Sequence, residues 1–164
     1  MALNDNVDIL RYGALLDAVR DNKPLVHHIT NYVTVNDCAN ITLATGASPV
    51  MADEPDDARE IAAAADAVVL NMGTLNSRTI PAMLTAGRAA NENNVPVVLD
   101  PVGVGASSLR NDTARRLLQE ISLTVVRGNI SEIRYLAGLH QHTKGVDASA
   151  SDIADSDDAR SIAR

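Results

Sequence analysis

Three short apolar runs, each separated from the next by a longer segment with helical spacing, constrain the fold of this chain most strongly. The runs are Ala67–Leu70, Pro96–Leu99 and Leu123–Val126. Each is too short for a helix and largely apolar, which is typical of a strand buried on both faces of a sheet. The segments between them, about 77–92 and 110–121, carry apolar residues at helical spacing. This alternation predicts an α/β fold with a mainly parallel sheet flanked by helices.

The first third of the chain continues the alternation. Strands are expected at 25–29 and 48–52, and helices at 8–21 and 33–45. Another helix is expected to begin at Glu54-Pro55, because proline suits the first helical position. The sequence therefore predicts strand–helix units from near the N-terminus onward, within a single domain of residues 1–164.

Glycines mark two of the predicted helix ends. Gly46 follows the helix at 33–45, and Gly138 follows one predicted at 129–137; glycine favours the left-handed conformation that often closes a helix. Residues 141–156 are polar and predict a loop, and 157–164 predict the start of a helix that is cut after about two turns. The domain is therefore expected to be incomplete, truncated at its C-terminus.

Charge and composition exclude several classes of protein. The net charge of −7 and the absence of a basic stripe argue against nucleic-acid binding. A single cysteine, Cys38, permits no internal disulfide and suits a reducing compartment. No apolar stretch is long enough for a membrane span, and the N-terminus lacks the pattern of a signal peptide. The sequence predicts a cytoplasmic protein without nucleic-acid or membrane partners.

Polar or glycine-rich residues follow four of the predicted strands. They are Thr30-Asn31, Asn71–Thr74, Asp100–Ala106 and Arg127–Glu132. In open α/β sheets ligands bind outside the carboxyl ends of the strands, so these residues are expected to form one site. A carboxylate such as Asp100 can hold Mg²⁺ there, or can simply cap a loop or helix.

Asn129-x-x-Glu132 allows two interpretations. At the start of a helix this spacing forms a capping box, which is the more common explanation. Together with the preceding Arg127 it also supplies a cation, a carboxylate and a helix N-terminus, which are parts that phosphoryl transfer uses. His27 and His28 are neighbours on a strand, point to opposite faces, and cannot bind one metal together. Cys38 is expected to be a small buried side chain within a helix.

Seven collinear segments resemble the hydroxyethylthiazole kinase family of the ribokinase-like superfamily. They are Pro24–Asn40, Gly46–Ala52, Asn71–Leu75, Leu99–Ala106, Arg127–Ile133, Ala137-Gly138 and Lys144–Asp147. The resemblance covers nearly the whole chain. It implies a three-layer ribokinase-like fold, of which the chain is the N-terminal part. It also implies transfer of a phosphoryl group from ATP, with Mg²⁺, to the hydroxyl of 4-methyl-5-(2-hydroxyethyl)thiazole, by a homotrimer with sites between its subunits.

The resemblance assigns roles to eight residues. It implies substrate contacts at Met51, Asn31, Gly73 and Thr74, ATP contacts at Arg127 and Asn129, and acidic residues near Mg²⁺ at Asp100 and Glu132. It implies no catalytic residue within the chain, because the base and the anion hole are expected beyond Arg164. Two alternatives remain open: an inactive remnant that binds ligand or oligomerises, and a related kinase of another small alcohol.

Overall fold

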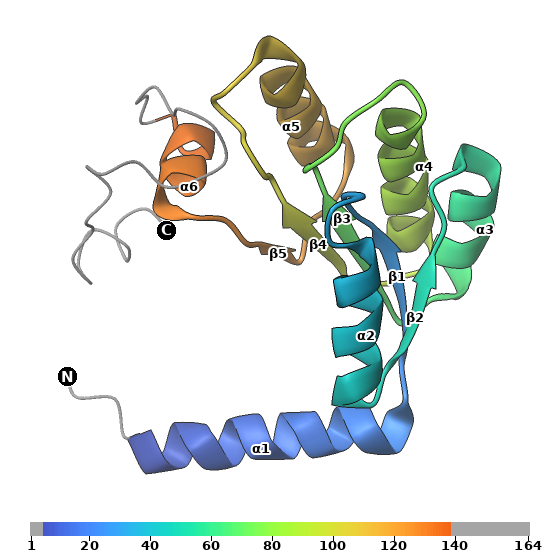
Figure 1. Ribbon diagram of the computed structural model, residues 1–164, viewed down its shortest axis with the longest axis vertical. Coiled ribbons are helices and arrows are strands. Elements are labelled where there is room, and N and C mark those ends of the chain that lie inside the picture. Colours follow the sequence, from blue (N-terminus) through green and yellow to red (C-terminus); the bar gives the residue numbers. More distant parts are fainter. Residues whose placement is uncertain (1–4, 139–164) are drawn as a thin grey trace.

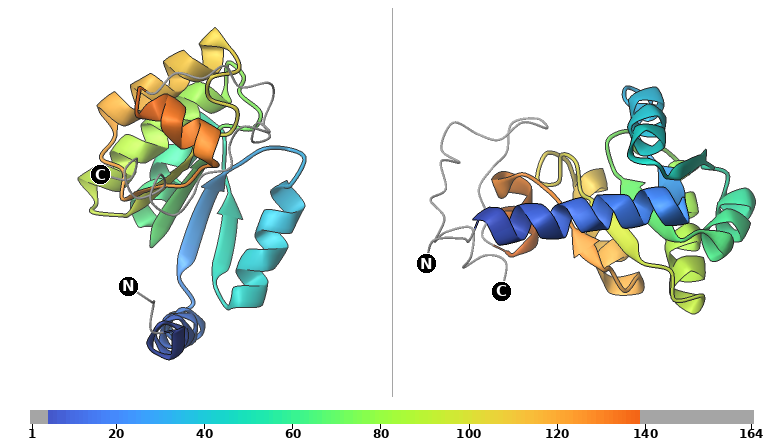
Figure 2. Two further views of the ribbon diagram at one scale, coloured as in Figure 1. Left: turned by 90° about the vertical axis from the view of Figure 1, so that its left-hand side faces the viewer. Right: turned by 90° about the horizontal axis from the view of Figure 1, so that it is seen from below.

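The computed structural model describes residues 5–138, which form a five-stranded, wholly parallel sheet with helices on both faces (Figures 1 and 2). In chain order the elements are α1 (Asp5–Asn22), β1 (Leu25–Ile29), α2 (Val35–Thr45), β2 (Ser48–Met51), α3 (Pro55–Ala64), β3 (Ala67–Asn71), α4 (Thr79–Glu92), β4 (Val97–Asp100), α5 (Ser108–Glu120), β5 (Val125–Val126) and α6 (Ile130–Leu136). The strand order is β2-β1-β3-β4-β5. The predicted α/β fold with a parallel sheet is confirmed.

The strand order contains a switch point between β1 and β3. From β1 the chain passes through α2 to the outer strand β2, and it then returns through α3 to β3 on the other side of β1. The helices that follow β1 and β3, α2 and α4, lie on opposite faces of the sheet (Figure 2). The loops leaving these neighbouring strands therefore diverge, and such a crevice is where doubly wound sheets bind ligands.

The core lies between the sheet and the helices α3, α4 and α5. Val68, Leu70, Val97 and Leu99 point to this face and are buried. Alanines line the facing surfaces of α3 and α4, so the two helices can approach each other and the sheet closely. This half of the fold is the rigid support of the carboxyl-end loops.

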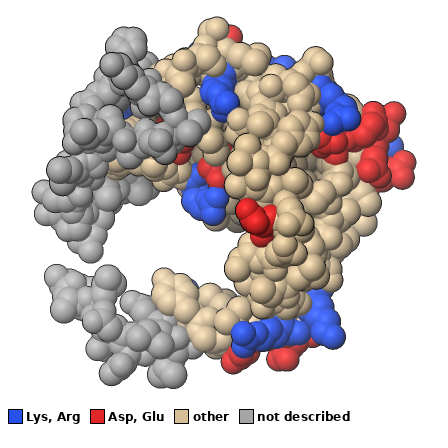
Figure 3. Space-filling view, in the orientation of Figure 1, with Lys and Arg blue, Asp and Glu red and all other residues tan. Residues whose placement is uncertain are grey.

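The opposite face of the sheet is covered less completely by the described residues. Helix α2 lies over it beside β2 and buries none of its own side chains, and Val69 and Val98 remain half-buried. Large apolar residues on α1 and α2 are exposed: Tyr12, Leu15, Leu16, Ile41 and Leu43. The surface over α2 is largely uncharged (Figure 3). The prediction that helices flank the sheet on both faces is confirmed, but the described residues cover the two faces unequally.

The Ser107 side chain caps α5, whereas the N-cap residue of α4 makes no such side-chain hydrogen bond. Helix α4 was expected from about residue 77 and begins at Thr79. In the turn before it, Asn76 Oδ1 accepts from the backbone N–H groups of Arg78 and Thr79. Helix α5 was expected from 110 and begins at Ser108, because the Ser107 side chain accepts from the Arg110 N–H. Sequence periodicity alone did not identify the Ser107 cap.

Glycines end two helices as expected. Gly46 has φ of 101° after α2, and Gly138 has φ of 78° after α6. The predicted loop at 141–156 and helix at 157–164 lie outside the described residues, and the single domain of residues 1–164 stays a prediction. Within residues 5–138 no helix is both long and apolar enough to cross a membrane.

Candidate functional site

A continuous chain of polar contacts runs along the carboxyl edge of the sheet. Asn31 Nδ2 donates to Asn71 Oδ1 at 3.3 Å, and Asn71 Nδ2 donates to Asp100 Oδ2 at 2.9 Å. The Arg127 guanidinium donates to the same Asp100 oxygen at 2.5 Å. These four residues end or follow the adjacent strands β1, β3, β4 and β5. The four polar strand ends predicted from the sequence therefore meet along one edge, as expected.

Asn31 and Gly73 shape the crevice at the switch point. Asn31 Oδ1 accepts from the N–H groups of Val33 and Thr34, at 3.1 Å each, and so orders the entry to α2. Gly73 N donates to Asn71 Oδ1 at 2.8 Å. A Cβ at Gly73 would lie 2.7 Å from Asn31 Cβ and 2.9 Å from Asn71 Oδ1. Only glycine lets the two asparagines meet here.

Arg110 joins two of the site loops and was missed by the sequence analysis. Its Nη1 donates to the carbonyl oxygens of Met72 and Val102, at 2.6 Å each, and its Nη2 donates to the Gly73 carbonyl at 2.9 Å. The guanidinium, which has five N–H donors in a fixed plane, can satisfy several carbonyls at once. No motif pointed to Arg110, because its partners are backbone atoms of distant loops.

Glu132 and Asn129 form the capping box that the sequence suggested. Glu132 N donates to Asn129 Oδ1 at 2.9 Å, and Asn129 N donates to Glu132 Oε2 at 2.8 Å. The other oxygen, Glu132 Oε1, accepts from Gly103 N at 2.9 Å. The buried Glu132 carboxylate thus fixes both the start of α6 and the glycine loop after β4.

Asp100 and Arg127 form an ion pair of unequal exposure. The Asp100 side chain is 11% exposed, whereas that of Arg127 is 75% exposed. The hydrogen bond and the charge of Asp100 raise the pKa of Arg127, so the guanidinium is firmly cationic. Asp100 Oδ1 accepts no hydrogen bond from the described residues, and Oδ2 accepts two. The pair presents a cation and a carboxylate together at the sheet edge.

The residues around Asp100 fit Mg²⁺ only as part of its coordination. No group of three or more His, Cys, Asp or Glu side chains suitable for a metal occurs within residues 5–138. Mg²⁺ commonly takes one or two carboxylates and completes its shell with water and substrate phosphate oxygens. Asp100 Oδ1 suits that arrangement, whereas both oxygens of Glu132 already accept backbone N–H groups.

Two hollows lie beside this polar chain. One, of about 170 Å³, is lined by His28, Thr30, Tyr32, Val35, Met51, Ala52 and Asp53. We call it the Met51 hollow. The other, of about 230 Å³, is lined by His28, Thr30, Cys38, Ile41, Thr42, Val69, Asn71, Val98, Asp100 and Arg127. They share His28 and Thr30. Cys38, expected to be buried, is half-buried at the second hollow.

The residues expected to contact substrate do not all lie in the Met51 hollow. Met51 lines it, whereas Asn31, Gly73 and Thr74 do not. Thr74 lies next to it and accepts through Oγ1 from the backbone N–H of Tyr32 at 3.3 Å. Tyr32 and Asp53, which the sequence analysis did not single out, line it instead. The other predicted roles remain predictions.

His27 and His28 point to opposite faces, as expected. His27 is fully buried and donates through Nε2 to the Ala52 carbonyl at 2.8 Å, while its Nδ1 is buried with no hydrogen-bond partner in the described structure. Burial lowers the pKa of His27 below its ordinary value of 6.5, and the Ala52 hydrogen bond and the charge of Asp57 oppose this less strongly. His27 is therefore neutral in the folded chain at neutral pH.

This burial predicts a stability that falls on acidification. The folded-state pKa of His27 lies below its unfolded value, so below about pH 6.5 the unfolded chain takes up a proton that the folded chain does not. The free energy of unfolding then decreases, with a limiting slope of about 1.4 kcal/mol per pH unit for one proton. Urea unfolding measured at pH 7.5 and at pH 5 should show that the free energy of unfolding falls less between these pH values for His27→Gln than for the wild type. Equal losses would contradict the prediction.

The fold and the site together define the class of protein. A doubly wound parallel sheet with polar contacts across its carboxyl edge is the arrangement of α/β proteins that bind small ligands at the switch point. The family model of the hydroxyethylthiazole kinase family matches residues 16–164. The chain belongs to the hydroxyethylthiazole kinase family.

Individual relatives agree with this. The chain is 59% identical over 143 residues to hydroxyethylthiazole kinase of Clostridium beijerinckii, a match that covers 87% of this chain and 52% of that protein. It is 49% identical over 160 residues to hydroxyethylthiazole kinase of Clostridium botulinum, with 98% and 57% covered. A solved structure of hydroxyethylthiazole kinase from Pyrococcus horikoshii superposes with a TM-score of 0.72 at 46% identity, covering 75% of this chain and 48% of that one. The chain spans about half the length of the curated relatives it matches.

Proposed function

We propose that the protein phosphorylates the hydroxyl of 4-methyl-5-(2-hydroxyethyl)thiazole, with ATP as co-substrate. The observation that carries this proposal, in a chain of this family, is that the Asp100–Arg127 pair lines the second hollow, which shares two lining residues with the Met51 hollow. The Met51 hollow would take the heterocycle, and the Asp100–Arg127 ion pair would face the phosphates of ATP. His28 and Thr30 border both hollows, so their shared wall is where the two ligands would meet.

Each predicted contact has a role in this proposal. Arg127 would bind the phosphates of ATP, because its guanidinium is cationic and its side chain is largely exposed. Asn129 would act beside it at the start of α6. Met51 would contact the thiazole ring, and Asn31, Gly73 and Thr74 would hold the loops around it.

Mg²⁺ would bind at Asp100, where one carboxylate oxygen accepts no hydrogen bond from the described residues. When bound, the ion would neutralise charge on the transferring phosphoryl group. Glu132 would support that region through the Gly103 N–H and the start of α6. For Glu132 to bind the metal directly, one of its oxygens would have to give up a backbone hydrogen bond. A direct ligand role for Glu132 stays a proposal.

The function is tested by a coupled assay of ATP turnover with the thiazole alcohol and Mg²⁺. Turnover that depends on the thiazole and is lost on chelation of Mg²⁺ would support the proposed function. Binding of the thiazole by calorimetry without turnover would favour the alternative of a ligand-binding remnant. Faster turnover of a different small alcohol would favour the related kinase instead.

A homotrimer in the cytoplasm is part of the same proposal. The exposed apolar side chains of α1 and α2, among them Tyr12, Leu15 and Ile41, offer surface that a second subunit could cover. Static light scattering of the assay sample gives the mass directly. A monomeric mass would contradict the trimer, while leaving the proposed reaction to the assay.

A further inference from the structure

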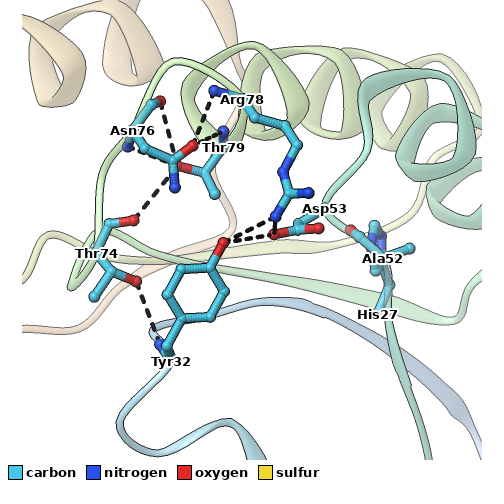
Figure 4. A network of polar contacts seen from close by, with 8 residues as sticks. All are labelled: His27, Tyr32, Ala52, Asp53, Thr74, Asn76, Arg78 and Thr79. Atoms are coloured by element: carbon cyan, nitrogen blue, oxygen red, sulfur yellow. Dashed lines mark hydrogen bonds and ion pairs between the residues drawn. The ribbon is translucent and has the colours of Figure 1, made fainter.

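A polar cluster outside the Asn31–Arg127 chain lies at the Met51 hollow, which two of its residues line. Figure 4 shows the contacts within this cluster. It consists of Tyr32 from the loop after β1, Asp53 from the loop after β2, and Arg78 directly before α4. Arg78 Nη2 donates to the Tyr32 hydroxyl at 2.9 Å and to Asp53 Oδ2 at 3.0 Å. The Tyr32 hydroxyl donates to the same Asp53 oxygen at 3.3 Å. One guanidinium and one phenol thus join three loops.

The backbone of the cluster is held as well. The Tyr32 N–H donates to Thr74 Oγ1 at 3.3 Å, which ties the loop after β1 to the loop after β3. Asn76 Oδ1 accepts from the N–H groups of Arg78 and Thr79, at 2.9 Å each, and fixes the turn that carries Arg78. The phenol ring is therefore restrained at its backbone and at its hydroxyl.

Stability of the fold does not account for this arrangement. Tyr32 is 55% exposed, and the Arg78 and Asp53 side chains are 54% and 32% exposed. Exposed ion pairs contribute little to stability, and an exposed ring buries little apolar surface. What the cluster does achieve is to hold an aromatic ring in one orientation beside the apolar Met51 and Val35. A ring held in advance loses less conformational freedom when a ligand packs against it.

We propose that Tyr32 is a ring-contacting residue of the Met51 hollow, and that Arg78 and Asp53 are positioning residues that hold its hydroxyl. The ligand class is a flat aromatic heterocycle, which can pack against the phenol ring and contact the Met51 thioether. The identity of that heterocycle as a thiazole rests on the proposed function. The anchoring of Tyr32 by Arg78 does not.

Calorimetric binding of the thiazole alcohol to single variants tests the ring contact. We expect Tyr32→Ala to weaken binding by about tenfold or more, because the stacking surface is lost. Tyr32→Phe and Arg78→Met should each weaken it by roughly three- to fivefold, since the ring stays but its anchor is lost. Arg78→Lys, which keeps a cation with several donors, should recover most of the affinity.

Arg88 supplies a matched control. Its side chain is 52% exposed, and it forms an ion pair with Glu120 away from the hollow. Arg88→Met should leave thiazole affinity unchanged, and urea unfolding should show similar stabilities for Arg78→Met and Arg88→Met. Equal weakening of binding by both variants would overturn the positioning role of Arg78.

A double variant asks whether Arg78 acts through Tyr32. If the guanidinium only holds the hydroxyl, Tyr32→Phe/Arg78→Met should bind the thiazole no more weakly than either single variant. Additive losses of binding affinity would overturn this part of the inference.

Tyrosine fluorescence tests the anchoring directly. The chain has three tyrosines and no tryptophan, so in a Tyr12→Phe/Tyr135→Phe background the fluorescence emission comes from Tyr32 alone. Arg78→Met should change that emission and Arg88→Met should not; unchanged emission with Arg78→Met overturns the anchoring.

The outcomes separate this inference from the proposed function. If Tyr32→Ala binds and turns over the thiazole as the wild type does, the ring contact is wrong and the proposed function stands. If the wild type binds no thiazole but binds another flat heteroaromatic alcohol, and Tyr32→Ala abolishes that binding, the ring contact is supported and the proposed substrate is wrong.

Discussion

Arg110→Met is expected to lower the free energy of unfolding by about 2–4 kcal/mol, because three backbone carbonyls lose their donor together. Two of these carbonyls belong to the loop after β3, at Met72 and Gly73, and the third belongs to Val102 in the loop after β4. Met72 is fully buried, so its neighbourhood cannot admit water freely to replace the guanidinium. Chemical unfolding in urea, followed by circular dichroism, measures the change.

Arg115 provides the control on the same helix. It forms an ion pair with Asp112 in which both side chains are largely exposed, at 60% and 63%. Arg115→Met should therefore change stability by less than about 1 kcal/mol. The loss of stability caused by Arg110→Lys should lie between those of Arg110→Met and Arg115→Met, since one ammonium group cannot reach all three carbonyls that the guanidinium contacts. Equal stabilities of Arg110→Met and Arg115→Met would show that the clamp contributes nothing measurable.

The fold could be predicted because its signals are local. Val97 and Leu99 lie in a short apolar run that cannot form a helix of useful length, and they are buried in β4. Gly46 marks a helix end through its own backbone conformation, with φ of 101°. Asp100 and Asn71 meet because parallel strands bring their carboxyl ends to one edge. Each of these features depends on a few adjacent residues or on the alternation itself.

The contacts that join the loops could not be predicted in this way. Arg110 reaches carbonyls 37 and 38 positions away, and Arg78 reaches Tyr32 across 46 positions. Such pairs depend on loop geometry and on strand order, neither of which the hydrophobic pattern specifies. A surface arginine in a helix looks the same in the sequence whether it clamps a loop or faces solvent. The exposure of Leu15 and Leu16 on α1 could not be predicted for a related reason, since helical spacing indicates an apolar face but not what packs against it.

Asp100→Asn should reduce thiazole-dependent turnover by on the order of 10²–10³-fold, if this carboxylate holds the cation as proposed. The substitution keeps the size of the side chain and leaves an oxygen that can accept from Asn71 or Arg127. It removes the negative charge on which a metal ligand depends. Mg²⁺-dependent ATP binding, measured by calorimetry, should weaken as well. This measurement separates the effect on metal-dependent binding from the effect on the chemical step.

The stability of Asp100→Asn decides between a chemical role and a structural one. Arg127 loses its partner, but its side chain is 75% exposed and water can solvate the freed charge. The free energy of unfolding should therefore fall by less than about 2 kcal/mol, far less than an unpaired charge would cost in the core. Asp112→Asn, at an exposed ion pair on α5, should alter neither turnover nor Mg²⁺ dependence. If Asp100→Asn instead retains turnover with unchanged Mg²⁺ dependence, the carboxylate serves only to hold Asn71 and Arg127, and the cation must bind elsewhere.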